Sequence, residues 1–189
     1  MIEVEVKVKL TDPVKFQQQL LNSGAVKLKT QREQDVYFKH PVIDFKETDE
    51  ALRLRKVNGE VYLTYKGSKI TPGTKTREEL SVQLSDFKTA KIILEKMKFQ
   101  TLAEVVKTRL IYQFNKIKIY VDDVEGLGCY AEFEILVKDN TEVEKAEKEI
   151  FSLISRLGFK PSHSITSSYL ELMLSKQAAN LNSNNKCKY

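Results

Sequence analysis

A strand-like alternation of charged and apolar residues recurs along this chain and restricts the folds open to it. Residues 2–8 place Glu3, Glu5 and Lys7 at alternate positions, with aliphatic residues between them. Because successive side chains of a strand point to opposite faces, the charges would share one face and the aliphatic residues the other. One such strand is typical of the wet side of an antiparallel sheet, so any functional meaning depends on whether the pattern is repeated.

The pattern returns in six later segments, which are 51–55, 61–66, 76–82, 105–114, 116–122 and 130–137. The middle segments add cations to the charged face, namely Arg53, Arg55, Lys66, Arg77, Lys107 and Arg109. The last segment adds Glu132 and Glu134, so the strands end with an acidic pair like the one that opens the chain. Two carboxylates about 7 Å apart on one face repel each other unless a positive charge lies between them. A divalent cation is the simplest such charge.

Length and composition indicate a single soluble domain. The 189 residues suffice for one core, and 41% of them are hydrophobic. There is no apolar run near the roughly 18 residues of a membrane span and no signal-peptide pattern, so we expect a cytoplasmic protein without a membrane partner. Cys129 and Cys187 have neither a disulfide-framework nor a metal-ligand spacing. The net charge of +5 is compatible with nucleic-acid binding, but the interleaved acids disfavour a long phosphate backbone as ligand.

Three amphipathic helices are expected between the strands. Asp12 and Pro13 provide an N-cap and a first helical residue for one of them. Ser85 can cap a second, whose apolar positions follow a 3.6-residue period. The capping-box sequence at 141–144 opens a third, which Gly158 ends.

The remaining sequence signals predict a hairpin turn and the end of the folded domain. Asn58-Gly59 between two alternating segments predicts a two-residue hairpin turn. A short helix is expected around 167–174. The domain is therefore predicted to span residues 1–175, and residues 176–189, which are poor in apolar side chains, to form a disordered tail.

These elements predict an α+β fold in which the charged sheet face encloses a site. The helices need the aliphatic face, so the charges must lie on the other one. If the sheet curls to remove its edges, those charges point into a wet tunnel. The arginines and lysines there would bind a polyanion, because buried charges require partners. Five acids form a hard-oxygen set suited to Mg²⁺ or Mn²⁺: Glu3, Glu5, Asp122, Glu132 and Glu134.

In these features the chain resembles the triphosphate tunnel metalloenzymes, or CYTH superfamily, and within it the class IV adenylyl cyclase branch. The resemblance runs from Met1 to about Leu174. It is carried by the Glu-x-Glu-x-Lys opening, 48–55, 65–67, the Lys107–Arg109 pair, Asp122 before 124–128, and Glu132-x-Glu134. The opening motif is weak alone, but six matches in order are specific.

The resemblance implies a closed, eight-stranded antiparallel barrel with helices packed outside it. It implies that a C-terminal helix, with Ser168 and Tyr169, plugs or lines one tunnel end. The five acids named above would hold metal, with Glu5, Lys7 and Glu134 central to catalysis. The phosphates would be bound by Lys7, Arg53, Arg55, Lys66, Arg77, Lys107 and Arg109.

The resemblance leaves the reaction open. Family members hydrolyse inorganic or organic triphosphates, and some convert ATP to cyclic AMP and pyrophosphate. Cyclases of this branch show a His-Phe-x6-Phe element, and here Phe38 and Phe45 keep the spacing while Tyr37 replaces the histidine. We therefore expect a divalent-metal-dependent triphosphatase acting on a small-molecule triphosphate. Adenylyl cyclase is the alternative, followed by non-catalytic binding of polyphosphate or RNA 5′ ends. A homodimer is compatible with either activity.

Overall fold

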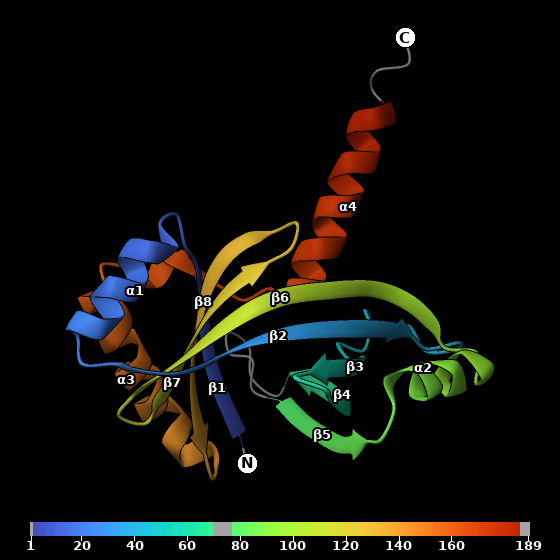
Figure 1. Cartoon of the computed structure of the whole chain (residues 1–189), viewed down its shortest axis with the longest axis horizontal. Helices are drawn as coiled ribbons and strands as arrows, with labels where there is room; N and C mark the ends of the chain where they lie inside the picture. Colours follow the sequence, from blue (N-terminus) through green and yellow to red (C-terminus); the bar gives the residue numbers. More distant parts are fainter. Residues whose placement is uncertain (1, 70–76, 186–189) are drawn as a thin grey trace.

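The computed structural model describes residues 2–69 and 77–185 (Figure 1). Within these residues, nine strands form one antiparallel sheet in the order β5-β4-β3-β2-β6-β7-β8-β1-β9. The strands are β1 Ile2–Lys9, β2 Val26–Lys39, β3 Ala51–Val57, β4 Glu60–Lys69, β5 Arg77–Leu84, β6 Gln100–Phe114, β7 Ile117–Val124, β8 Gly128–Val137 and β9 Ser164–Ile165. The α-helices are α1 Pro13–Asn22, α2 Phe87–Lys96, α3 Val143–Arg156 and α4 Tyr169–Asn185, with 3-10 turns at 140–142 and 161–163.

Two long strands connect the two ends of the molecule. β2 and β6 have 14 and 15 residues and pair along almost their whole length. Figure 1 shows them crossing the molecule between α1 and α3 at one end and α2 at the other. The sheet can therefore curl around one face while helices cover parts of the opposite face.

The aliphatic face of the sheet packs on the helices, as the alternation predicts. The larger core joins Phe16 and Leu20 of α1 and Ile150 of α3 to Phe133 and other residues of β1, β6, β7 and β8. A smaller core lies between α2 and strands β2 to β4. Burial of these aliphatic and aromatic side chains supplies most of the driving force for folding and directs the charged residues to the concave face.

The α+β class is confirmed, but closure into an eight-stranded barrel is not seen among the described residues. The sheet is a curled half-barrel in which β1 and β5 approach each other without backbone pairing. The ninth strand, β9, pairs with β1 through the register of Lys7 with Ile165. Hydrogen bonding from β9 thus occupies part of the β1 edge.

The helix starts show where local capping differs from the sequence prediction. The start of α1 is confirmed, because the Asp12 carboxylate accepts a hydrogen bond from the Lys15 amide at 2.9 Å. In α2, Asp86 replaces the expected Ser85 as the cap. The predicted capping box at 141–144 does not form, because Asp139 caps a preceding 3-10 turn. Gly158, at φ +89°, ends α3 as expected, since L residues with a Cβ rarely adopt this conformation.

Helix α4 is longer than the sequence predicts. It continues to Asn185 and projects from the sheet (Figure 1), so residues 176–185 are helical where a disordered tail was expected. A low apolar content removed the signal for a buried face, but Lys, Gln and Ala residues such as Ala178 and Ala179 have good helix propensity. Residues 186–189 lie outside the described part of the chain.

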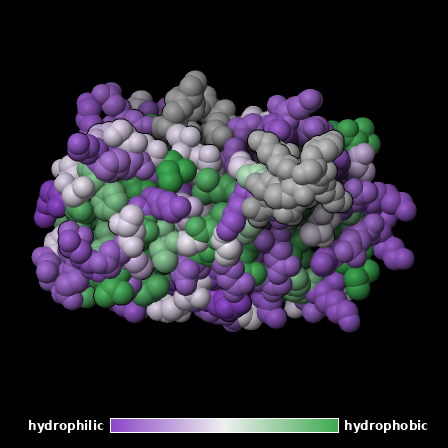
Figure 2. All heavy atoms as spheres, turned by 90° about the horizontal axis from the view of Figure 1, so that it is seen from above, coloured by the Kyte–Doolittle hydropathy of each residue, from purple (hydrophilic) through white to green (hydrophobic). Residues whose placement is uncertain are grey.

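Hydrophilic side chains cover much of the face seen in Figure 2, with smaller hydrophobic areas between them. In the part of the chain that the structure describes, no helix has the length and apolar character needed to cross a membrane.

Candidate functional site

A cavity of about 440 Å³ lies on the concave, charged face of the sheet. Its wall contains every site residue predicted from the sequence except Asp122. Cations reach it from β1, β3, β4, β5 and β6, and acids from β1, β5 and β8. The β2–β3 loop and the first turns of α4 complete the wall. Residues far apart in sequence therefore converge because each strand contributes its charged face.

The carboxylates on β1 and β8 form a cluster of like charge. In the register of these strands Glu5 is directly opposite Glu134, a pairing that is unfavourable for two ionised acids. Burial, together with Glu5 and more weakly Glu134, raises the pKa of Glu3 to about 8. Burial also raises the pKa of Glu134, whose Oε2 accepts a hydrogen bond from the Tyr120 hydroxyl at 2.9 Å. At Glu3, burial and repulsion by the other carboxylates therefore outweigh the opposing effect of Lys66 on its pKa.

The carboxylate oxygens of this cluster are of the kind that a hard divalent cation prefers. Glu3, Glu5 and Glu134 all line the cavity and offer carboxylate oxygens, the ligands that Mg²⁺ and Mn²⁺ prefer. Among the described residues, no three acids, histidines or cysteines are already gathered as a metal centre. A cation here would offset the repulsion that raises the pKa of Glu3.

The other two acids predicted as metal ligands are engaged with cations. Asp122 is fully buried, and its two oxygens accept hydrogen bonds from Arg109 Nε and Nη2 at 2.7 and 2.6 Å. Glu132 accepts a hydrogen bond from Arg109 Nη2 at 2.5 Å and lies 3.2 Å from Lys7 Nζ. In this arrangement Asp122 orients Arg109 from behind the wall, outside the set of acids that face the cavity.

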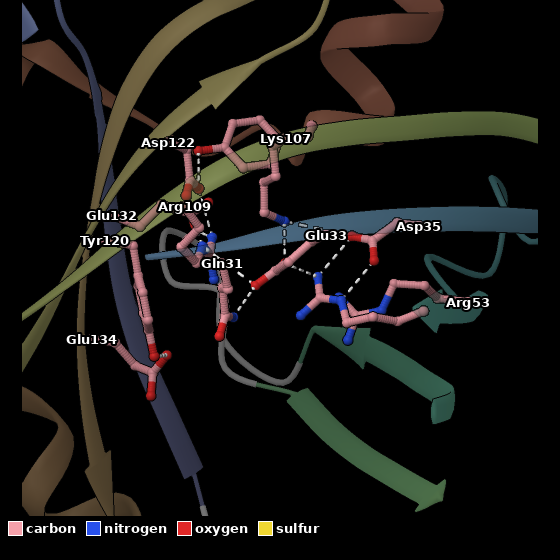
Figure 3. A network of polar contacts seen from close by, with 12 residues as sticks. Gln31, Glu33, Asp35, Arg53, Lys107, Arg109, Tyr120, Asp122, Glu132 and Glu134 are labelled. Carbon is pink, nitrogen blue, oxygen red and sulfur yellow. Dashed lines mark hydrogen bonds and ion pairs between the residues drawn. The ribbon is translucent and has the colours of Figure 1, made fainter. Parts of the chain in front are cut away.

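Two buried acids on β2, Glu33 and Asp35, were missed by the sequence analysis (Figure 3). Glu33 lies 2.8 Å from Lys107 Nζ and 3.0 Å from Arg55 Nη2. Asp35 accepts two hydrogen bonds from Arg55, at 2.6 and 2.7 Å. Burial opposes ionisation of both acids, but the surrounding cations outweigh it: they hold the pKa of Glu33 at about 2 and lower that of Asp35.

A signal for these acids was present in the sequence. Gln31, Glu33, Asp35 and Tyr37 alternate along β2, but this segment is not among those identified above as strand-like. A strand assigned to residues 31–37 would have placed all four side chains on the charged face. Their role is to fix Arg55, Lys107 and Arg109 relative to one another.

Arg53, Lys66 and Arg77 are less completely neutralised than the cations that Glu33 and Asp35 hold. Arg53 is buried, and its Nε has no hydrogen-bond partner within residues 2–69 and 77–185. Its Nη2 lies 3.4 Å from Glu79, which also pairs with Lys66 at 2.7 Å. Arg77 lies 3.7 Å from Asp49. An anion with several oxygens would satisfy these donors, because a buried donor without an acceptor is costly.

The aromatic residues of the cyclase-like element also face the site. Tyr37, Phe38 and Phe45 all line the cavity, and Tyr37 is buried. The position that is histidine in cyclases of this branch is thus inside the cavity and occupied by a phenol.

A curled antiparallel sheet with acids and cations converging in one cavity agrees with the family that the sequence resembles. Residues 1–169 match the CYTH domain, and the chain belongs to the CYTH family.

Known relatives share this fold over nearly their full length. The chain is 40% identical over 172 residues to a protein named "Putative adenylate cyclase MJ0240" from Methanocaldococcus jannaschii, covering 91% of this chain and 98% of that protein. The structure of PH1819 from Pyrococcus horikoshii is 37% identical, with a TM-score of 0.83 over 92% of this chain and 99% of the other. A Hippeastrum protein described as having a dominant triphosphatase activity shares the fold at 18% identity, with a TM-score of 0.67 over 94% and 95% of the two chains.

Proposed function

We propose that this protein binds a small-molecule triphosphate together with Mg²⁺ or Mn²⁺ and hydrolyses it, releasing phosphate. The observation that carries the proposal is the convergence of cations from five strands and the acidic cluster Glu3, Glu5 and Glu134 on one cavity. A ligand that binds only the cations would leave the acidic cluster unexplained, and a metal ion alone would leave the cations unexplained. Arg53 Nε has no hydrogen-bond partner among the described residues, and burial and like charge raise the pKa of Glu3, so a metal–triphosphate complex would stabilise both groups.

The protein side chains would contribute to catalysis mainly by binding and positioning the phosphates. Arg53, Arg55, Lys66 and Arg77 would bind phosphate oxygens and hold the chain of phosphates along the cavity. Lys7, Lys107 and Arg109, fixed by acids behind them, would neutralise charge that develops during phosphoryl transfer. When bound at Glu3, Glu5 and Glu134, a divalent ion supplies Lewis-acid stabilisation of phosphate oxygens. Phosphoryl transfer of this kind requires no histidine or cysteine nucleophile.

Cyclisation of ATP is the second candidate. It is favoured by the adenylate cyclase name of the Methanocaldococcus relative and by the aromatic wall of Tyr37, Phe38 and Phe45. Hydrolysis is preferred because it requires only that the phosphates are bound and that a water molecule is aligned for attack. Cyclisation must also fold the ribose 3′-hydroxyl onto the α-phosphorus, where a small misplacement costs about 100-fold. The Hippeastrum protein, described as a putative adenylyl cyclase with a dominant triphosphatase activity, is consistent with hydrolysis on this fold.

The test is to resolve the products from tripolyphosphate and from ATP, each with Mg²⁺ and with Mn²⁺. Orthophosphate from tripolyphosphate, with little cyclic AMP from ATP, supports hydrolysis. Stoichiometric pyrophosphate and cyclic AMP from ATP, with tripolyphosphate left intact, would establish the cyclase. Saturable binding of tripolyphosphate without turnover under any of these conditions would indicate a binding protein.

Substitution of the acidic cluster tests the role of metal. Glu5→Gln or Glu134→Gln should lower kcat by about 100-fold or more, as expected for loss of a main electrostatic stabiliser, while the circular dichroism spectrum is retained. The matched control is Glu144→Gln, which removes an exposed acid paired with Lys148 on α3, and it should leave kcat unchanged. Full activity of the wild type in excess EDTA would refute metal dependence.

A further inference from the structure

Tyr169 lies against the cations of the cavity, although it comes from α4 and not from the sheet. Its ring centroid is 4.0 Å from Lys7 Nζ and 5.4 Å from Lys107 Nζ. Its hydroxyl donates a hydrogen bond to Asp122 Oδ2 at 2.8 Å, and the same carboxylate holds Arg109. One side chain thus contacts two proposed phosphate ligands directly and a third through Asp122.

Local structure fixes where Tyr169 lies. The Ser168 amide donates to the Glu171 carboxylate at 2.5 Å, and the Glu171 amide donates to Ser168 Oγ at 3.2 Å. This reciprocal pair is a capping box, which makes Tyr169 the first residue of α4. Just before it, β9 pairs Ile165 with Lys7. The start of α4 is therefore anchored beside the residue that Tyr169 contacts.

The segment around Tyr169 supplies groups that contact the ammonium of Lys7. Lys7 is only 1% exposed, so its ammonium needs compensation within the protein. Nζ donates a hydrogen bond to the Ser167 carbonyl at 2.9 Å, lies 3.2 Å from Glu132, and faces the Tyr169 ring. The face of an aromatic ring attracts a cation, more strongly where water is excluded. Two of these three groups come from residues 167–169.

We propose that Tyr169 is a positioning residue of the site: its ring fixes Lys7 and Lys107 in the cavity wall, so docking of α4 completes the phosphate-binding set. The inference rests on the proposed function, because it takes these lysines as phosphate ligands. The α4 segment is then part of the site itself, since Ser168, Leu170 and Leu174 also line the cavity.

Tyr130 provides a matched control for the packing that Tyr169 contributes. The two rings make an edge contact at 5.4 Å and belong to one buried cluster with Val105 and Val124. Tyr130 is 4% exposed and is not part of the cavity wall. Replacing either tyrosine with leucine removes a similar buried volume, but only the Tyr169 substitution removes the ring from Lys7.

The experiment compares Tyr169→Leu, Tyr169→Phe and Tyr130→Leu in the full chain, with tripolyphosphate and Mg²⁺. Tyr169→Leu should lower kcat/KM by about 30-fold, because a desolvated cation–π contact can contribute about 2 kcal/mol and each 1.36 kcal/mol is tenfold in rate. Tyr169→Phe keeps the ring and should recover kcat/KM to within about threefold of the wild type. Tyr130→Leu should also stay within about threefold. Equal losses in the two leucine variants, or no recovery in Tyr169→Phe, would overturn the proposal.

A measurement without substrate separates this inference from the proposed function. In protein carrying ¹³C-labelled lysine, ring current should shift one lysine side-chain signal, assigned to Lys7 by its absence in Lys7→Met. The shift should persist in Tyr169→Phe and Tyr130→Leu and disappear in Tyr169→Leu. Absence of a shifted signal in the wild type would overturn the contact itself. A wild type that shows the shift but does not bind tripolyphosphate would overturn the proposed function, and with it the positioning role.

Discussion

The buried carboxylate of Glu33 offers a sharp test of how the site is held together. Glu33 is 1% exposed and lies within 3.0 Å of Lys107 and Arg55, with Arg109 Nε at 3.8 Å. The substitution Glu33→Gln keeps the shape of the side chain and removes its charge. Lys107 and Arg55 would then share Asp35, while Arg109 would keep its pairs with Asp122 and Glu132.

Two independent arguments give the size of the effect. The surrounding cations lower the pKa of Glu33 from 4.5 to about 2, and each pKa unit corresponds to 1.36 kcal/mol, so its ionised form stabilises the fold by about 3 kcal/mol. Removing one partner of a buried ion pair typically costs about 3–5 kcal/mol, because the other charge is left uncompensated. We therefore expect Glu33→Gln to lower the free energy of unfolding at pH 7 by about 3 kcal/mol.

Urea unfolding followed by circular dichroism measures this difference. The control is Glu125→Gln, which removes an equally close pair, to Arg32 at 2.7 Å, whose side chains are 60% and 68% exposed. Exposed pairs contribute at most about 1 kcal/mol, so the control should change little. Comparable effects of the two substitutions would refute the reasoning.

The pH dependence provides a further check on the cause. Because the folded-state pKa of Glu33 is depressed, its contribution is fully present above about pH 4.5 and is lost as the pH falls through 2. The difference in free energy of unfolding between wild type and Glu33→Gln should therefore decrease by roughly half between pH 7 and pH 3. A difference that stays constant over this pH range would mean that the shape of the Glu33 side chain, and not its charge, causes the loss of stability.

Two other predictions concern the cations and the acidic cluster. Arg55→Lys cannot reproduce the two hydrogen bonds to Asp35, so calorimetry should show weaker tripolyphosphate binding; unchanged affinity would exclude a role for the guanidinium. Glu3 has a raised folded-state pKa of about 8, so it binds protons in the folded state that the unfolded state releases, and its contribution to stability should fall as the pH rises from 4.5 to 8. In thermal melts, the melting temperature of the wild type should fall between pH 6 and pH 8.5. The fall should be smaller for the wild type with added Mg²⁺ and smaller for Glu3→Gln. An equal fall in all three samples would contradict this explanation.

The charged face of the sheet could be predicted from the sequence because its signal is local. Alternation with a period of two placed Glu5 and Arg55 on the concave side without any knowledge of strand order. The pairing of Lys7 with Glu132 and the convergence of β3 and β6 on one cavity depend on the order of the strands in the sheet, which neither the local pattern nor the family resemblance specified.

The sequence analysis was weakest where a residue's role depends on a distant partner. Asp122 and Glu134 look alike in the sequence, since each is an acid on the charged face of a strand. In the structure Asp122 is surrounded by Arg109 and Tyr169, whereas Glu134 lies opposite Glu5. No local rule distinguishes an acid that holds an arginine from one that we propose as a metal ligand, because the difference lies on another strand.

The balance of charge in and behind the cavity wall supports the proposal that metal and phosphate bind there together. Among the described residues, eight cations line the cavity: Lys7, Lys46, Arg53, Arg55, Lys66, Arg77, Lys107 and Arg109. Eleven described acids lie in or directly behind the same wall: Glu3, Glu5, Glu33, Asp35, Asp49, Glu50, Glu79, Asp122, Glu132, Glu134 and Glu171. With all of them ionised, these groups have no excess of positive charge to attract a highly anionic triphosphate. Divalent cations at the acidic cluster would supply that excess, so we expect triphosphate affinity to rise with Mg²⁺ or Mn²⁺ concentration and metal affinity to rise with triphosphate, as linkage requires.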